Sequence, residues 1–309
     1  MTLKILPRST VSWEDFQKEA PRFSIALDGY VSGEPKISEL TGHATFNHHE
    51  NVNRIATRCT AGQVVIALKQ DLLTVFPEDQ ITIWVNDCDQ DVCTAIWALN
   101  NHERIEGLRS EPLLSRLLFN VDLMDTCAGA YPVDPKSKII KEMGWIFEGY
   151  TNSRLSGRIN DMGADEMLEI IEATCARISM YSLGQGKTKE PDTRYETLIS
   201  TDTFKIVKEL GTEARTAMRR DGVKGFVSFK GGDEQTGFIY SIGNLTPFGG
   251  LPMDKVYTAL NQIEGLSEHN PDKWGGSDSC GGSPRTGKSK IPPHHLQIIL
   301  SDILKSGNN

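Results

Sequence analysis

The sequence predicts an α/β protein in which a mostly parallel β-sheet carries helices on both faces, followed by a smaller α+β C-terminal domain. Short apolar runs typical of strands alternate with segments of helical apolar spacing in the first half of the chain, and this alternation is typical of a parallel sheet covered by helices. A hydrophobic fraction of 38% is enough for a packed core. A length of 309 residues favours two domains over one.

The first half of the chain supplies the elements of the sheet. Apolar runs that we interpret as strands lie at residues 23–27, 81–85 and 113–121. Apolar residues recur at helical spacing over residues 54–73 and 92–99. Sheets of this kind bind ligands at the carboxyl ends of their strands, where several loops converge.

The second half of the chain is divided from the first by a polar segment rich in Gly, Lys and Thr at residues 184–191. We therefore expect a first domain at residues 1–183 and a second at residues 184–309. Further helices are predicted at residues 139–147, 167–181, 204–218 and 253–263. Strands are predicted at residues 225–230 and 237–240, with a turn at 231–233, before a glycine-rich segment at 274–290 and an apolar stretch at 296–304.

Charge and cysteine content exclude some classes of protein. The net charge is −8 without a long basic run, so a general polyanion-binding surface is not expected. The six cysteines form no CxxC pair, which is poor spacing for a zinc site or a disulfide framework. Reduced thiols and the lack of an apolar N-terminal segment favour a cytoplasmic location. No apolar run is long enough to span a bilayer, so no membrane association is expected.

Acidic residues follow the predicted strands. Asp28 comes after the run at 23–27, Asp87 after the run at 81–85, and Asp122 and Asp125 after the run at 113–121. The carboxyl ends of parallel strands meet at one edge of a sheet, so these side chains are expected to form one cluster. For Asp122 and Asp125 the alternative is that they only cap a helix.

Two further motifs offer metal ligands. Asn47-His48-His49-Glu50 lies between a strand-like segment and a helix, and imidazole with carboxylate oxygen suits Mn, Fe or Zn. Neighbouring residues of a strand point to opposite sides, so the alternative is a pair of ordinary partly buried or surface histidines. Asp87, Asp89 and Asp91 would repel one another in apolar surroundings without a cation. Their alternative is a solvated acidic turn, which the buried pattern that resumes at Val92 disfavours.

Together these residues resemble the DHH phosphoesterase superfamily. Asn47-His48-His49 resembles its DHH triplet, with Asp28 twenty residues before His48 in place of the family's isolated aspartate. Asp87-x-Asp89-x-Asp91 resembles the HxDxD signature that opens a helix, and Asp125-Thr126 resembles the last acidic motif. The resemblance covers most of residues 23–130. Asn47 replaces the triplet's aspartate, Asp87 stands where the signature has histidine, and the signature follows the triplet instead of preceding it. These departures indicate a permuted or divergent member.

The resemblance implies a metal-dependent hydrolase that cleaves a phosphoester or phosphoanhydride bond in a small phosphorylated or nucleotide substrate, with a short single-stranded oligonucleotide as a further candidate. It implies two Mn²⁺ or Mg²⁺ ions that activate water. It assigns catalytic roles to His49, as substrate contact or general acid, and to Asp89. The metal ligands that it implies are Asp28, His48, Asp87, Asp89, Asp91 and Asp125. The alternative is a catalytically silent relative that binds metal or nucleotide.

The glycine-rich segment carries the candidate substrate contacts Gly281, Gly282, Arg285 and Lys288, and it resembles the glycine-rich motif in the C-terminal domain of many DHH proteins. Residues 282–289 also satisfy the phosphate-loop pattern GxxxxGK[ST]. A nucleotide hydrolase driven by Lys288 is disfavoured, because Pro292 and Pro293 block a helix at that point. We interpret the segment as a flexible loop whose amides hold a phosphate, with a disordered surface loop as the alternative. A structural or interaction protein with solvated acids is the remaining rival.

Overall fold

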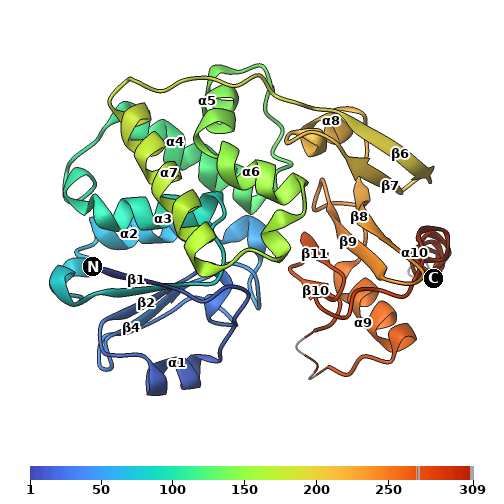
Figure 1. The fold of residues 1–309 in the computed structure, drawn as a ribbon, viewed down its shortest axis with the longest axis horizontal. Coiled ribbons are helices and arrows are strands. Elements are labelled where there is room, and N and C mark those ends of the chain that lie inside the picture. Colours follow the sequence, from blue (N-terminus) through green and yellow to red (C-terminus); the bar gives the residue numbers. More distant parts are fainter. Residues whose placement is uncertain (269, 271, 307–309) are drawn as a thin grey trace. The chain divides into compact units, whose positions relative to one another are not determined.

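The structure is a computed structural model that describes residues 1–268, 270 and 272–306. Residues 269, 271 and 307–309, which fall in the predicted second domain, lie outside the described residues. The chain divides into two compact units (Figure 1). Unit 1 comprises Met1–Thr126 and Lys136–Glu190, and unit 2 comprises Cys127–Pro135 and Pro191–Asn309. The predicted α/β fold class is confirmed; the predicted domain boundary at residues 183 and 184 stays a prediction.

Unit 1 contains a five-stranded sheet with the order β1-β5-β2-β4-β3. Its strands are β1 (Thr2–Ile5), β2 (Ser24–Leu27), β3 (Lys36–Ser38), β4 (His43–Phe46) and β5 (Thr82–Val85). All neighbouring strands are parallel except β3, which pairs antiparallel with β4. Every residue of β2 and of β4 is buried, as expected for central strands covered on both faces.

Helices cover both faces of this sheet (Figure 1). Helix α1 (Trp13–Glu19) covers one face, where Phe16 packs in a core cluster with Ala26 of β2 and with Tyr30. The longer helices gather on the opposite side of the sheet in Figure 1. They are α2 (Thr60–Lys69), α3 (Gln90–Asn100), α4 (Pro112–Thr126), α5 (Lys138–Ile146), α6 (Glu148–Leu155) and α7 (Ala164–Ser182).

Unit 2 contains a six-stranded sheet with the order β10-β11-β9-β8-β7-β6. Its strands are β6 (Tyr195–Ser200), β7 (Phe204–Glu209), β8 (Gly225–Asp233), β9 (Gly237–Asn244), β10 (Gly275–Gly276) and β11 (Cys280–Gly282). Only the β7–β8 pair is parallel among the strands described. The helices are α8 (Ala214–Arg220), α9 (Met253–Glu264) and α10 (Pro293–Ser306).

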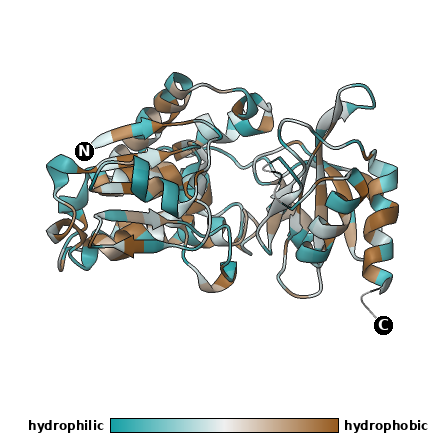
Figure 2. Ribbon diagram, turned by 90° about the horizontal axis from the view of Figure 1, so that it is seen from below, coloured by the Kyte–Doolittle hydropathy of each residue, from teal (hydrophilic) through white to brown (hydrophobic). Residues whose placement is uncertain are grey.

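The core of unit 2 lies against this sheet in two clusters. In the larger cluster α9 and α10 contribute Leu260, Leu296 and Leu300, which pack with apolar residues of β7, β8 and β9. In the smaller cluster Met218 of α8 packs with Phe226 of β8. Figure 2 shows α10, the helix nearest the C label, with both apolar and polar residues along its length, which is the pattern of a helix with one face on a core. No described helix is both long and apolar enough to cross a bilayer.

The structure corrects the prediction for residues 113–121, which were expected to form a strand. They lie within α4. Leu114, Leu117 and Val121 are the buried apolar residues of this helix, and a spacing of three and four is the helical period. Asp122 and Asp125 therefore follow the same run as expected, but they project from the last turns of a helix and not from the end of a strand.

Residues 204–218 were predicted to be a helix, which is wrong for their first half. Strand β7 ends at Glu209, and α8 begins only at Ala214. Residues 204–209 pair with β6 and β8, and Gly211 follows where a Cβ would lie 2.0 Å from the carbonyl oxygen of Asp192. Residues 54–73 were also expected to be one helix, but α2 covers only Thr60–Lys69 between two short 3₁₀ turns. Residues 231–233 belong to β8, and the turn lies between Asp233 and Gly237.

Candidate metal centre

Three neighbouring strands of unit 1 direct the candidate residues to one edge of the sheet. Strands β5, β2 and β4 are adjacent and parallel, so their carboxyl ends lie side by side. Asp28 begins the 3₁₀ turn η1 (Asp28–Tyr30) directly after β2. His48 and His49 follow β4, and Asp89 follows β5 as the N-cap of α3. Residues that are far apart in the sequence therefore converge because of the strand order.

Asp28 adopts an unusual backbone conformation that aims its carboxylate at the cluster. Its φ is +54°, in the left-handed region where aspartate is among the tolerated residues other than glycine. The chain reverses there from β2 into η1, and the Asp28 side chain is 8% exposed. Its Oδ1 lies 2.6 Å from Nε2 of His49 and 3.6 Å from Nε2 of His48. A strained, buried carboxylate at a strand end is typical of a functional position.

Asn47 shapes the loop that carries both histidines. Its Nδ2 donates to the carbonyl oxygens of Val31 (3.0 Å) and Gly33 (2.8 Å). Its Oδ1 accepts from the backbone amides of His48 (2.7 Å) and His49 (3.1 Å). Aspartate, which resembles it in shape, has no N–H to donate to the two carbonyls. The turn places the two imidazole rings with their centroids 4.6 Å apart, so neighbouring histidines face one site despite the strand before them.

One ring nitrogen of His48 is surrounded by carboxylates. Nε2 lies 2.8 Å from Oδ2 of Asp125 and 3.6 Å from both Oδ1 of Asp28 and Oδ2 of Asp91. His48 is fully buried. Neither ring nitrogen makes a well-aligned hydrogen bond within the described residues, and the close approach to Asp125 is an ionic contact without that alignment. A buried imidazole nitrogen facing several carboxylate oxygens is a donor set that a divalent cation satisfies.

Among the residues that the structure describes, two groups have the spacing to hold a metal ion, and His48 belongs to both. Asp28, His48 and His49 form the first group, and His48, Asp91 and Asp125 form the second. In each group the candidate ligand atoms all lie within 4.8 Å of one another. Buried Asp and His side chains of unit 1 can therefore hold a metal ion.

Arg54 fixes the orientation of His49. Arg54 lies in the 3₁₀ turn η2 (Arg54–Ala56), is 4% exposed, and donates from Nη1 to Nδ1 of His49 (3.0 Å). A guanidinium has no acceptor atom, so Nδ1 must be the acceptor. The proton of neutral His49 then lies on Nε2, which donates it to Asp28. Nη2 of Arg54 also donates to the carbonyl oxygen (2.9 Å) and to Oδ2 (3.3 Å) of Asp125.

Asp91 joins the starts of two helices. It lies in the first turn of α3, and its Oδ2 and Oδ1 accept from the amides of Thr60 (2.6 Å) and Ala61 (2.7 Å) at the start of α2. Amides at a helix N-terminus stabilise a negative charge. Each oxygen of a carboxylate keeps a second lone pair, so these bonds leave Asp91 able to bind a cation. Asp89 caps α3 by accepting from the amide of Val92 (2.8 Å).

The pKa values of the cluster show how its charges are balanced. Burial raises the pKa of Asp89, and the nearby charge of Asp28 raises it further. Burial, followed by the charge of Asp125, raises the pKa of Asp91 to about 6. Burial acts in the same direction on Asp28, but His49, His48 and Arg54 together outweigh it and lower the pKa of Asp28. In the same way His48 and Arg54 together outweigh burial and lower the pKa of Asp125.

His48 completes this balance. Burial lowers the pKa of His48, but the carboxylates of Asp125 and Asp91 together outweigh burial and raise it. In the protein without a cation, the raised pKa values of Asp89, Asp91 and His48 favour their protonated forms, on Asp91 below a pH of about 6, and these protons offset part of the negative charge. A bound cation would replace these protons, because metal ligands must be deprotonated.

Asp87 and Asp89 lie outside both metal-binding groups. Asp87 accepts from the amide of Cys88 (2.6 Å), and its charge contributes to the raised pKa of Asp89. Asp122, the other acid of the third motif, has a different role. It accepts from the amide of Cys59 (2.8 Å) and pairs with Arg58 (2.7 Å), so it holds the start of α2.

The sequence did not indicate two residues of this neighbourhood. Arg54 lies only five residues after His49 but belongs to no recognisable motif. Tyr150 lies on α6, about sixty residues after Asp89, and its pKa is raised by burial and then by the charges of Asp87 and Asp89. A tyrosine on a distant helix carries no signal in a single sequence.

The predicted substrate contacts lie in unit 2, and the predicted metal ligands lie in unit 1. Gly281 and Gly282 belong to β11, where a Cβ on Gly281 would lie 2.3 Å from the carbonyl oxygen of Gly275. These glycines therefore permit close approach of strands. Arg285 is exposed, and Lys288 has a φ of +53°.

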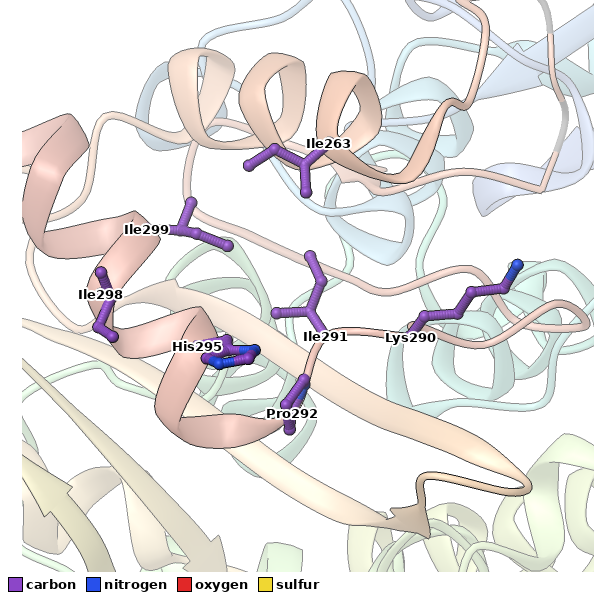
Figure 3. A pocket seen from close by; sticks show the side chains of 7 residues that line it. All are labelled: Ile263, Lys290, Ile291, Pro292, His295, Ile298 and Ile299. Carbon is purple, nitrogen blue, oxygen red and sulfur yellow. The ribbon is translucent and has the colours of Figure 1, made fainter.

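An apolar groove lies between α9 and the start of α10 in unit 2 (Figure 3). It is lined by Ile263, Lys290, Ile291, Pro292, His295, Ile298 and Ile299. The lining contains no carboxylate, so this groove lacks the chemistry of the candidate metal centre.

The comparisons with known proteins add no relative to this picture. No family model, no curated protein and no solved structure matches the chain significantly.

Proposed function

We propose that this protein is a metal-dependent hydrolase that cleaves a phosphoester or phosphoanhydride bond in a small phosphorylated or nucleotide substrate. The observation that carries the proposal is the environment of His48, whose buried Nε2 faces carboxylate oxygens of Asp28, Asp91 and Asp125. These residues come from a strand end, a helix start and a helix end. So many buried carboxylates repel one another unless cations or protons neutralise them.

The donor set supports the choice of cation. Carboxylate oxygens suit Mn²⁺ and Mg²⁺, and an imidazole favours Mn²⁺ over Mg²⁺. Two ions are proposed from the resemblance to the superfamily. The two groups share His48, whose Nε2 has one lone pair and binds one ion, so a second ion would rest on the carboxylate oxygens. Asp28, His48, Asp91 and Asp125 would hold them, and Asp87 and Asp89 are proposed as further ligands. When bound, such ions lower the pKa of a water molecule and offset negative charge on phosphate oxygens.

The remaining residues position the reacting groups. Arg54 keeps the proton of neutral His49 on Nε2, from which His49 could donate it to a substrate oxygen as a general acid. Asp89, whose pKa is raised, is proposed as a catalytic group beside the ions. The net charge of −8 favours a small substrate over long nucleic acid. Membership of the DHH superfamily, and contacts of Arg285 and Lys288 with a substrate phosphate, stay predictions.

A catalytically silent, metal- or nucleotide-binding protein is the second candidate. Asn47 replaces the aspartate of the family's triplet, and its amide bonds to backbone groups on both sides. Asp87 and Asp89, which resemble the family's signature, lie outside both metal-binding groups. Both observations favour a centre that has kept its ligands and lost turnover.

Metal content and activity of the purified full chain test the proposal. The variants are His48→Ala and Asp89→Ala, with His102→Ala as matched control, because His102 is also nearly buried and pairs with Glu106 (2.7 Å) outside the cluster. We expect bound Mn²⁺ and hydrolysis of at least one member of a panel of phosphodiesters and phosphoanhydrides. His48→Ala should lower Mn²⁺ affinity by at least ~10–100-fold, the loss typical of residues that only support a ligand. Asp89→Ala should abolish turnover.

Three results separate the candidates. Full activity and metal content in Asp89→Ala would remove its catalytic assignment. Bound metal and tight nucleotide binding without turnover would favour the silent protein. No bound divalent ion in the wild type at millimolar Mn²⁺ would end the hydrolase proposal, and no nucleotide binding in addition would end the second candidate.

A further inference from the structure

The tip of the glycine-rich loop in unit 2 is arranged around a carboxylate. The backbone amides of Arg285, Thr286 and Gly287 all donate to the side chain of Asp272, over 2.6, 3.1 and 2.6 Å. Consecutive backbone amides that converge on one point form a concave anion site. The loop was expected to offer these amides to a phosphate, but an internal anion already accepts from all three.

The loop is anchored at both ends without Asp272. Before the tip, Ser283 donates its amide to the carbonyl oxygen of Tyr240 (3.1 Å), and its Oγ accepts from the amide of Tyr240 (3.1 Å). After the tip, Ser289 and Phe238 exchange two backbone hydrogen bonds of 2.7 and 2.9 Å. Only the tip itself therefore depends on Asp272.

Glu264 strengthens the second anchor. Its Oε1 accepts from the amide of Lys290 (2.5 Å) and from Oγ of Ser289 (3.2 Å), and its Oε2 accepts from Nε1 of Trp274. Trp274 is fully buried, so this contact ties the loop to the core of unit 2. The anchors on both sides of the tip do not involve Asp272, so they would keep the tip amides in a concave arrangement when Asp272 moves away.

The charges around the tip favour a stronger anion than a carboxylate. Arg285, Lys288 and Lys290 lie in or directly after the tip. None of the three forms an ion pair within the described residues, although the charge of Lys288 contributes to the lowered pKa of Asp233. The tip residues are exposed and Asp272 is only partly buried, so a dissolved ligand can reach them. A phosphate group offers more charge and more acceptor oxygens than a carboxylate, and both Arg and Lys pair with it well.

We propose that the amides of residues 285–287 form a phosphate-binding site that the side chain of Asp272 occupies in the free protein, and that a phosphate group binds by displacing Asp272. Asp272 is thus a built-in competitor that weakens binding. Residues 282–289 match the phosphate-loop pattern. In this proposal the match reflects backbone amides that bind an anion, although the strand and helix of a nucleotide-hydrolase loop do not flank them. The site stands apart from the proposed hydrolysis, since all its residues belong to unit 2.

Amide signals of the full chain test this directly. Inorganic phosphate is titrated into the wild type, Asp272→Ala and Asp272→Asn in the presence of EDTA, and the ¹H–¹⁵N signals of residues 285–287 are followed. The control is Asp278→Ala, which removes an exposed acid of the same glycine-rich segment. We expect saturable shifts in Asp272→Ala with an apparent Kd at least tenfold lower than in the wild type and in Asp278→Ala. Asp272→Asn, which keeps an acceptor oxygen but no charge, should be intermediate.

Several results would overturn the proposal. Equal phosphate affinity in Asp272→Ala and Asp278→Ala would show that Asp272 does not compete. Identical shifts with potassium chloride at matched ionic strength would show screening alone. Loss of the three amide signals in both Asp272 variants, without recovery on addition of phosphate, would show that Asp272 is only a clamp. Because EDTA removes metal ions, failure here leaves the proposed hydrolase untouched, and failure of the hydrolase leaves this site untouched.

Discussion

Replacing Asp91 with asparagine should change the stability of the metal-free protein in a pH-dependent way. Asp91 is fully buried, and its pKa rises from 3.8 to about 6 in the folded protein. Because the folded-state pKa is the higher one, ionisation of Asp91 opposes folding. Protonated Asp91 therefore contributes stability at low pH. The wild type loses this contribution as the pH rises from about 3.8 to about 6, and it does not regain it at higher pH. The shift corresponds to about 3 kcal/mol.

Asparagine removes the charge but also one acceptor oxygen. The amides of Thr60 and Ala61 both donate to Asp91, so one of them would face an NH₂ group, at a cost of about 1–3 kcal/mol. This cost does not depend on pH. Between pH 4 and pH 7 the wild type should therefore lose about 3 kcal/mol of unfolding free energy relative to Asp91→Asn.

Urea unfolding in EDTA at a series of pH values measures this difference. Tryptophan fluorescence reports mainly on unit 1, which holds Trp13, Trp84, Trp97 and Trp145 of the five tryptophans. Addition of millimolar Mn²⁺ should stabilise the wild type and leave Asp91→Asn nearly unchanged, because a ligand that binds only the folded state stabilises it.

Asp122→Asn is the matched control. Asp122 accepts from the amide of Cys59 at the start of the same helix α2 and lies outside the metal-binding groups. It should lose about 1–2 kcal/mol and keep the full response to Mn²⁺. The reasoning is refuted if Asp91→Asn differs from the wild type by the same amount at pH 4 and pH 7, or if both respond equally to Mn²⁺.

Three more predictions follow from the same contacts. Mn²⁺ affinity, measured by calorimetry, should fall up to about tenfold per pH unit below about 6, because a proton on Asp91 competes with the ion; equal affinity at pH 5 and pH 7 would contradict this. Arg54→Met should lower kcat about 10–100-fold, as expected for loss of charged hydrogen bonds. The metal content should be kept, and Arg54→Lys should recover part of the activity. Unchanged kcat would show that the contact of Arg54 with His49 is only structural. Phe16→Ala should lower the unfolding free energy of unit 1 by about 3–5 kcal/mol, because Phe16 is 2% exposed, and it should leave Mn²⁺ affinity unchanged. A loss below about 1 kcal/mol in urea unfolding would contradict the packing of α1.

The sequence was sufficient for elements whose pattern is local. The runs before Asp28 and Asp87 form β2 and β5, because continuous apolar runs bounded by polar residues are typical of buried parallel strands. The helix after Asp89 was also predicted, because an aspartate followed by a periodic apolar segment is a helix start. The rule that parallel strands end at one edge predicted a cluster of Asp28, Asp87, Asp122 and Asp125, of which Asp28 and Asp125 belong to the metal-binding groups. His48 and Asp91 were predicted as ligands only by the resemblance.

Local pattern failed where tertiary contacts decide the structure. Residues 113–121 and 204–209 contain apolar residues that fit either a helix or a strand, and the neighbours on which they pack selected α4 for one and β7 for the other. The strands β1 and β6 were not predicted, because neither contains a buried residue and polar residues interrupt both, so no continuous apolar run marks them.

The sequence by itself determined which acids and histidines this protein can bring to a sheet edge, because residue type and the alternation of strands and helices are local properties. Only the tertiary structure decided their roles. It assigned Asn47 to the backbone, made Arg54 the partner of His49 and placed Asp272 among the amides of the glycine-rich loop. Each of these depends on hydrogen bonds whose direction and partner are set by the folded backbone, and no spacing along the chain encodes them.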